Sequence, residues 1–295
     1  MKLPFSRIAK PIKRLLWLFA GMLLVLAPAR ADHDNPIRIA IPNSLFHMQY
    51  VLLSDLQQYL EGKLKRPVKL IMRRKVDDTA MQMYAGKYDF AWTTDYPHIH
   101  NFAHAKSGAR LVAVPLYKGQ PYYTSYLIVP AYDTRTKSLL QLKGAVFSLS
   151  DLNHNGCNLE VAYALQMAGE DPKHFFHKII YAESQIEVIK AVTVGLAHAG
   201  AVESIVWDAF ARARPDLAAR TRVVAQTEAH GAPPLVANHF VSQENFKAMQ
   251  RVLVDMAIDP KGLDLLKRLN LDGFTPGDEN IYKRNLKMMA AIGEE

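Results

Sequence analysis

Hydrophobic and polar positions follow the same order twice along the chain. A run with helical spacing, a glycine and a short apolar strand occupy residues 79–94, and the same order returns at residues 187–203. Gly86 and Gly195 stand where a glycine commonly ends a helix. The apolar run after each glycine has the length of a buried strand. The repetition therefore predicts two similar α/β units.

Thr94 and Glu203 fall at the same place in the two units, each at the carboxyl end of its strand. In open α/β sheets, ligands bind outside the carboxyl ends of the strands. The two units thus predict two lobes, with Thr94 and Glu203 on opposite walls of one cleft.

The rest of the pattern also alternates between strands and helices. Such alternation predicts mainly parallel sheets flanked by helices. With no long linker in the sequence, we expect crossing strands at residues 122–129 and 235–241 to join the lobes. The first lobe then comprises residues 32–121 and 236–295, and the second lobe residues 122–235. The expected strands are residues 37–41, 68–72, 111–116, 122–129, 145–149, 178–181, 222–226 and 235–241, and the expected helices include residues 48–62, 99–107, 159–168, 246–258 and 261–269.

The first 31 residues have the pattern of a cleavable secretory signal. A basic segment precedes an apolar stretch at residues 15–26, and Ala29-Arg30-Ala31 fits a cleavage site. The apolar stretch is short for a membrane span, although an uncleaved anchor is the alternative. We therefore expect a periplasmic protein.

Removal of the signal changes the charge balance. The whole chain carries a formal charge of +8, but the signal holds six basic and no acidic residues, which leaves 30 basic against 28 acidic residues. This balance gives no electrostatic footprint for nucleic acid, so no nucleic-acid partner is expected. Cys157 is the only cysteine, so the chain has no internal disulfide and depends on packing.

Catalytic motifs are missing from the sequence. We find no nucleophile elbow, phosphate-binding glycine loop, dinucleotide fingerprint or zinc-protease helix. Cys157 with His154 leaves a thiol-dependent enzyme as an alternative, but we expect no enzyme activity. His100 and His104 share one helix face, yet no acidic or cysteine partner lies nearby, so neither a metal nor another cofactor is expected.

The polar segment at residues 150–158 connects a strand to a helix. Backbone amides at such a helix start bind anions, but Asn155 or Asn158 would also serve as an ordinary cap. Cys157 lies in the same segment, where a helix start lowers the pKa of a thiol. Polar neighbours and Gly156 argue against deep burial, although a small core cysteine is the other interpretation.

Several segments together resemble the phosphate/phosphite/phosphonate-binding proteins of ABC transporters, which have the type II periplasmic binding protein fold. The resemblance implies two α/β lobes, a ligand bound between them and a membrane partner. The segments that carry it are residues 86–92, 119–129, 139–144, 147–151 and 182–208.

The resemblance also implies ligand contacts. Tyr123 matches the cleft tyrosine of the family, Ser184 lies in a ligand-contacting loop, and Glu203 replaces a family aspartate. The family's Ser/Thr-rich phosphate loop falls at residues 154–157, where Cys157 stands in place of an expected glycine. The full set of expected ligand-binding residues is His47, Thr93, Thr94, Tyr123, Asn155, Gly156, Cys157, Asn158, Ser184 and Glu203.

These features predict a periplasmic solute-binding protein. It would capture a small phosphonate-, phosphite- or phosphate-like oxyanion and present it to an ABC permease. One alternative is a sensing protein for a membrane sensor histidine kinase, with a thiophilic oxyanion such as arsenite bound through Cys157. The thiol-dependent enzyme is the second alternative.

Overall fold

The computed structural model describes residues 35–42, 50–73, 79–93, 108–150 and 155–293. The chain divides into residues 1–36 and the unit Ile37–Glu295, and every element described here belongs to the second of these. In the described part of the chain, no helix has the length and apolar character needed to cross a membrane.

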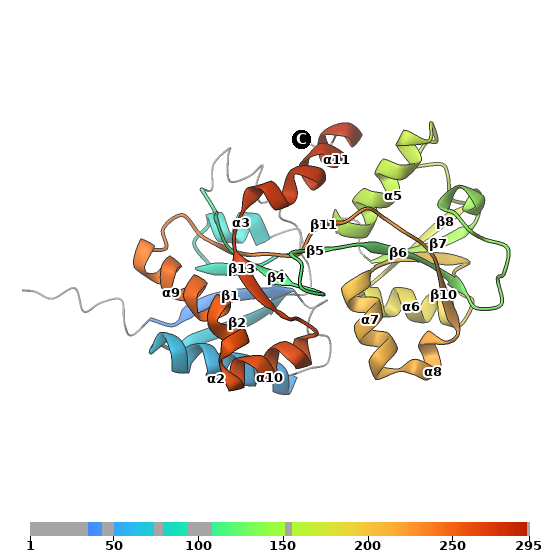
Figure 1. The fold of residues 1–295 in the computed structure, drawn as a ribbon. Coiled ribbons are helices and arrows are strands. Elements are labelled where there is room, and N and C mark those ends of the chain that lie inside the picture. The colour runs from blue at the N-terminus through green and yellow to red at the C-terminus, as the bar shows by residue number, and fades with distance from the viewer. Residues whose placement is uncertain (1–34, 43–49, 74–78, 94–107, 151–154, 294–295) are drawn as a thin grey trace, which may run out of the picture. The chain divides into compact units, whose positions relative to one another are not determined.

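The first sheet has six strands in the order β13-β4-β12-β3-β1-β2 (Figure 1). Parallel pairing is confined to β3–β1–β2, and the other three pairs are antiparallel. Its elements are β1 (Ile37–Pro42), α2 (Tyr50–Leu64), β2 (Val68–Arg73), α3 (Thr79–Tyr84), β3 (Phe90–Trp92), β4 (Arg110–Leu116), β12 (Leu235–Ala237), α9 (Gln243–Val254), η4 (Asp255–Ile258), α10 (Pro260–Leu269) and β13 (Gly273–Pro276).

The second sheet has five strands in the order β10-β6-β9-β7-β8. Here β9–β7–β8 pair in parallel, and β6 and β10 add antiparallel strands. Its elements are β6 (Ser125–Pro130), η3 (Leu139–Leu142), β7 (Val146–Ser150), α5 (Asn155–Met167), β8 (Lys178–Ala182), α6 (Gln185–Thr193), β9 (Ala199–Glu203), α7 (Ser204–Ala213), α8 (Pro215–Ala218) and β10 (Thr221–Gln226).

Two sheets, each with its own helices, confirm the predicted two-lobed α/β fold. The sheets are mixed, however, and not mainly parallel. A strand that reaches a sheet from the other lobe enters it in the opposite direction, so β12 and β6 pair antiparallel with β3 and β9.

The repeat seen in the sequence is also present in the structure. α3 leads through Gly86 into β3, and α6 leads through Gly195 into β9. Both glycines have positive φ, 73° and 76°, and in both turns the next N–H donates to a carbonyl five residues back. Only glycine adopts this left-handed conformation without strain, which explains its place in both helix ends.

Two chain segments cross between the sheets. β5 (Tyr122–Tyr123) precedes β6 and pairs antiparallel with β11 (His230–Gly231), which lies between β10 and β12. The first crossing segment was predicted at residues 122–129. The second was predicted at residues 235–241, but Leu235–Ala237 already belongs to the first sheet, so the crossing occurs earlier, around β11.

The C-terminal segment makes a third connection. After β13, the chain forms η5 (Glu279–Tyr282) and α11 (Lys283–Ile292). The Tyr282 hydroxyl donates to the carbonyl oxygen of Ala232, and Gly231 N–H donates to Asn285 Oδ1 at 3.2 Å. α11 then packs on α5 through Leu159, Met288 and Met289. The helix therefore contacts both the crossing strand and the second sheet's largest helix (Figure 1).

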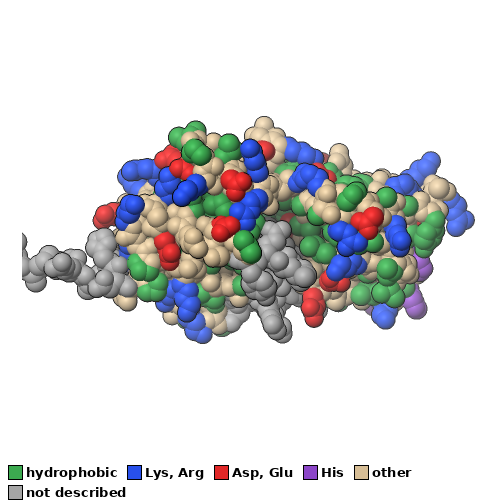
Figure 2. All heavy atoms as spheres, turned by 90° about the horizontal axis from the view of Figure 1, so that it is seen from below, with side chains coloured by type: hydrophobic (Ala, Val, Ile, Leu, Met, Phe, Trp, Pro, Cys, Tyr) green, Lys and Arg blue, Asp and Glu red, His purple; other side chains and the backbone are tan. Residues whose placement is uncertain are grey.

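Each lobe has a hydrophobic core, and a further cluster joins first-sheet residues to Ile205 of α7. In the first lobe, Trp92 and Phe274 meet edge to face with ring centroids 5.5 Å apart, beside an apolar cavity of about 20 Å³. In the second, Phe147 and Phe176 stack at 4.3 Å. On the face in Figure 2, basic and acidic side chains are interspersed.

Candidate functional site

A buried polar group lies where the first crossing strand meets the second sheet. Tyr123, from β5, donates its hydroxyl to Glu203 Oε1 at 3.3 Å, at the carboxyl end of β9. Glu203 is only 3% exposed, and its N–H donates to Gln185 Oε1 at 2.6 Å. Burial raises the pKa of Glu203, although Gln185, His230 and Tyr123 oppose that shift. Burial likewise raises the pKa of Tyr123, with a further contribution from Glu203.

Cys157 belongs to the same group. It lies in the first turn of α5, is 4% exposed, and donates its Sγ hydrogen to Ser125 Oγ at 3.5 Å. Two expectations about it were wrong. The helix begins at Asn155, so the segment at residues 155–158 is helical and Cys157 packs in the core instead of an exposed loop. Burial, and next the charge of Glu203, raise the pKa of this thiol far above its usual range, so it is not a thiolate.

Other expected ligand residues lie elsewhere or have other contacts. Ser184 is buried and caps α6, where its hydroxyl accepts the N–H of Glu187 at 3.3 Å. Thr93 follows β3 in the first sheet, and its N–H donates to the carbonyl oxygen of Pro234. Asn158 is half-buried on α5.

Asn155 and Gly156 contribute backbone to the first turn of α5. His47 and Thr94 lie outside the described residues, as do His100, His104, His154 and the predicted helix at residues 99–107.

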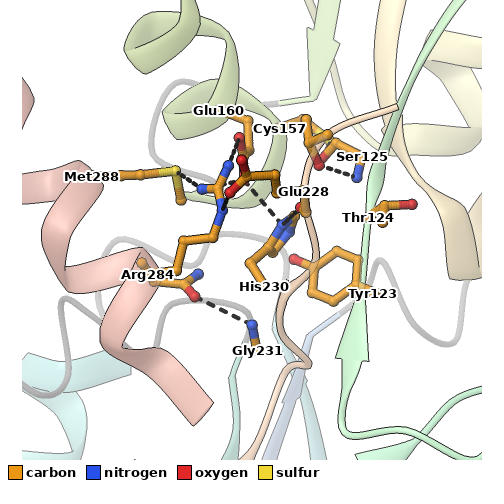
Figure 3. Close-up of polar contacts among 12 residues, drawn as sticks. Tyr123, Thr124, Ser125, Cys157, Glu160, Glu228, His230, Gly231, Arg284 and Met288 are labelled. Atoms are coloured by element: carbon orange, nitrogen blue, oxygen red, sulfur yellow. Dashed lines mark hydrogen bonds and ion pairs between the residues drawn. The ribbon is translucent and has the colours of Figure 1, made fainter. Parts of the chain in front are cut away.

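The structure adds residues that the sequence analysis did not select (Figure 3). Glu160 follows Cys157 by one turn of α5 and is buried, and its Oε1 lies 3.1 Å from His230 Nδ1. Arg284, from α11, lies 3.2 Å from the same oxygen and 3.2 Å from Glu228. The His230 ring meets Tyr123 edge to face at 4.1 Å. Spacing of three residues on one helix was a signal for Glu160, because such residues share a face.

The arrangement suits binding through hydrogen bonds. A phenol, a thiol, an imidazole and two carboxyl groups lie together in a region shielded from water, where polar interactions are strong and unpaired groups are costly. Among the described residues, no three His, Cys, Asp or Glu side chains come close enough together to hold a metal ion.

Comparisons with known proteins concern the family and the fold of the chain. The family model described as "ABC transporter, phosphonate, periplasmic substrate-binding protein" matches residues 47–282. PhnD1 from Prochlorococcus marinus in complex with methylphosphonate has a similar fold, with a TM-score of 0.75, 17% identity, and coverage of 88% of this chain and 98% of that chain.

Two further solved structures are similar. The binding protein component of an ABC phosphonate transporter from Pseudomonas aeruginosa gives a TM-score of 0.74 at 18% identity, covering 88% of this chain and 86% of that one. XAC2383 from Xanthomonas citri bound to ATP gives 0.70 at 19% identity, covering 88% and 98%. These likenesses identify the type II periplasmic binding protein fold. With a family match that spans most of its length, this chain belongs to the periplasmic substrate-binding proteins of phosphonate ABC transporters.

Proposed function

We propose that the protein captures a small phosphonate-, phosphite- or phosphate-like anion beside Tyr123 and Glu203 and hands it unchanged to an ABC permease. The observation that carries this proposal is the buried polar group itself. It joins a crossing strand, through Tyr123, to a strand end and a helix start of the second sheet, through Glu203 and Cys157. A ligand held at such a junction stabilises the closed arrangement of the lobes, because its contacts form only when both lobes meet.

The proposed site includes the first turn of α5. Backbone N–H groups at a helix start and the helix dipole favour an anion there, and Tyr123 supplies a hydroxyl. His47, Thr93, Thr94, Asn155, Gly156, Asn158 and Ser184 complete the proposed set of contacts. We also propose that residues 1–31 are a cleavable signal, that residues 32–121 and 236–295 form one lobe, and that residues 122–235 form the other.

The protonation state of the Cys157 thiol affects which ligand we propose. A soft oxyanion such as arsenite bonds to thiolate sulfur, but burial keeps the Cys157 thiol protonated. A neutral thiol instead donates a weak hydrogen bond, which suits a hard phosphorus oxyanion. We therefore favour the phosphonate class over a thiophilic ligand.

Thermal unfolding with a panel of anions tests the proposal. A ligand that binds only the folded state stabilises it by about 2.7 kcal/mol at one hundred times its Kd. Methylphosphonate, phosphite or phosphate should raise the Tm, arsenite should not, and each anion should be recovered chemically unchanged. A rise with arsenite alone would reject the proposed ligand class, as would no rise with any anion.

Tyr123→Phe is the matched variant for this panel. It keeps the ring against His230 but removes the hydroxyl that reaches Glu203. The free variant should have a lower Tm than wild type, because buried Glu203 Oε1 loses its donor, and its rise in Tm with the active anion should shrink. An undiminished rise would place the ligand away from Tyr123.

A further inference from the structure

His230 has one ring nitrogen with a hydrogen-bond partner and one without a partner in the described part of the chain. The side chain is fully buried, at 0% exposure, in the crossing strand β11. Its Nε2 has no hydrogen-bond partner among the described residues. A buried polar atom without a partner is costly, and native structures usually satisfy it with protein, water or ligand. Its ring contacts Tyr123, the residue at the centre of the proposed site.

The protonation of Nδ1 follows from its neighbours. Glu160 Oε1 lies 3.1 Å away and the carbonyl oxygen of Glu228 lies 3.4 Å away (Figure 3). Both are acceptors, so Nδ1 carries a hydrogen. The carbonyl oxygen of Glu228 accepts the Nδ1 hydrogen, with Glu160 Oε1 close by as an ion-pair neighbour, so Nε2 is the ring nitrogen that remains for a ligand.

A chain of contacts holds the carboxylate of Glu160. Arg284 from α11 lies 3.2 Å from Glu160 Oε1 and 3.3 Å, through its second nitrogen, from Oε2. The same guanidinium pairs with the exposed carboxylate of Glu228. Arg284 therefore fixes Glu160, and Glu160 fixes His230.

The charges around the ring determine what Nε2 can bind. Glu160 from α5, Glu203 from β9 and Glu228 from its own segment are acidic, Arg284 from α11 is basic, and Tyr123 and Cys157 are neutral. An anion placed here would meet two buried carboxyl groups. Since Arg284 is taken up by Glu160 and Glu228, His230 Nε2 is the nitrogen in this group that, among the described residues, remains for an oxygen of the ligand.

We propose that His230 is a ligand-contacting residue, whose Nε2 forms a hydrogen bond with an oxygen of the bound anion. Glu160 and Arg284 are positioning residues that act through it. The inference rests on the proposed function and names a contact within that site.

Isothermal titration calorimetry with methylphosphonate separates the two ring nitrogens. His230→Asn keeps a polar atom near the place of Nδ1 and loses Nε2, whereas His230→Gln places an amide nitrogen near Nε2. The Asn variant should bind at least tenfold more weakly than wild type, with the Gln variant in between. His198→Asn is the control, because His198 is an exposed histidine whose Nδ1 accepts the N–H of Val146, and its Kd should not change.

A double-mutant cycle tests whether Glu160 acts through His230. Glu160→Gln keeps the length of the side chain but removes the charge that pairs with Arg284. Its loss of methylphosphonate affinity should be smaller in the His230→Asn background than in the wild-type protein, because residues that act through one another are not additive. Additive losses would show that Glu160 has a merely structural role.

The outcomes distinguish this inference from the proposed function. Wild-type affinity in His230→Asn would overturn the role of His230 while methylphosphonate binding still supported the function. Failure of the wild-type protein to bind methylphosphonate, phosphite or phosphate would reject the function and this inference with it.

Discussion

β3 of the first sheet and β9 of the second occupy equivalent places, but they carry different side chains. β3 pairs with β1 and β12, and β9 pairs with β7 and β6. When the two strands are compared by these pairings, Ala91 of β3 is equivalent to Gly200 of β9, and Trp92 is equivalent to Ala201. Trp92 fills the first core against Phe274 and donates its Nε1 hydrogen to the carbonyl oxygen of Pro233. The first sheet thus places a large ring where the second has a methyl group.

The small residues of β9 have a consequence for chemistry. They leave room for helices to approach the second sheet closely, so that Val188 of α6 lies against Gly200 and Cys157 of α5 joins the core cluster of Ala199 and Ala201. The same topology therefore supports a packed apolar centre in one lobe and a buried polar group in the other. The fold sets the positions, and the sizes of a few strand residues determine what can be placed there.

Removal of the large ring from the first sheet should have the largest effect on stability. Trp92→Ala should lower the free energy of unfolding by about 3–5 kcal/mol, because truncation of a buried Trp leaves a cavity. Urea denaturation measures the loss. Ile258→Ala, at a side chain that is 83% exposed, should stay within about 0.5 kcal/mol of wild type. A loss for Trp92→Ala as small as the control's would refute the comparison.

Addition of a methyl group to the second sheet should have the next largest effect on stability. An added Cβ at Gly200 would lie 2.6 Å from Val188 Cγ1 and 3.0 Å from the carbonyl oxygen of Ser148. Gly200→Ala should therefore cost about 1–3 kcal/mol by overpacking, even though Ala91 is the equivalent residue of the first sheet. Gly62→Ala on α2, where nothing lies within 4 Å, should instead stabilise by about 0.5–1 kcal/mol. Equal effects at both sites would show that α6 does not need the close approach.

A smaller, pH-dependent effect should come from Glu203. Its pKa in the folded protein is raised above the ordinary 4.5 by burial, so the protonated form favours folding and this contribution is lost as pH rises through the raised value. Glu203→Gln cannot ionise. The stability of the variant relative to wild type should increase as pH rises across that window, measured by urea denaturation at each pH.

Asp171 provides a control of opposite sign. Its pKa is lowered, chiefly by the hydrogen bond with His174, so its contribution to stability is present above the ordinary carboxyl range and is lost as pH falls. The stability of Asp171→Asn should approach that of wild type as the pH falls. If the stability difference between Glu203→Gln and wild type is the same at every pH, the buried carboxyl is not protonated as described.

The last prediction concerns the chemical reactivity of Cys157 and needs no substitution. A buried thiol with a raised pKa should react with iodoacetamide near pH 8 far more slowly in the native protein than in urea, since the thiolate is the nucleophile. Mass spectrometry follows the alkylation. Similar rates in both states would mean that Cys157 is accessible and ionised.

The sequence was sufficient for the parts of the fold set by local patterns. The helix–glycine–strand repeats at Gly86 and Gly195 were predicted because positive φ, turn and buried strand follow one another within a few residues. The antiparallel pairing in the two sheets was not predicted, because the direction of β6 and β12 depends on which lobe each strand has just left.

The site was less predictable. Tyr123 and Glu203 were selected, and they share a hydrogen bond. Cys157 was selected with the wrong environment, because its burial depends on the small side chains of β9, distant in sequence. His230 and Arg284 were missed, since they reach Glu160 only after β11 and α11 fold against α5.

A crystal structure of the protein grown with methylphosphonate tests most directly whether the buried polar group holds the ligand. We predict density for the anion in contact with the Tyr123 hydroxyl, the first turn of α5 and His230 Nε2. Well-ordered anion density elsewhere in the protein, with the Tyr123–Glu203 hydrogen bond unchanged and Nε2 still unpartnered, would contradict this assignment.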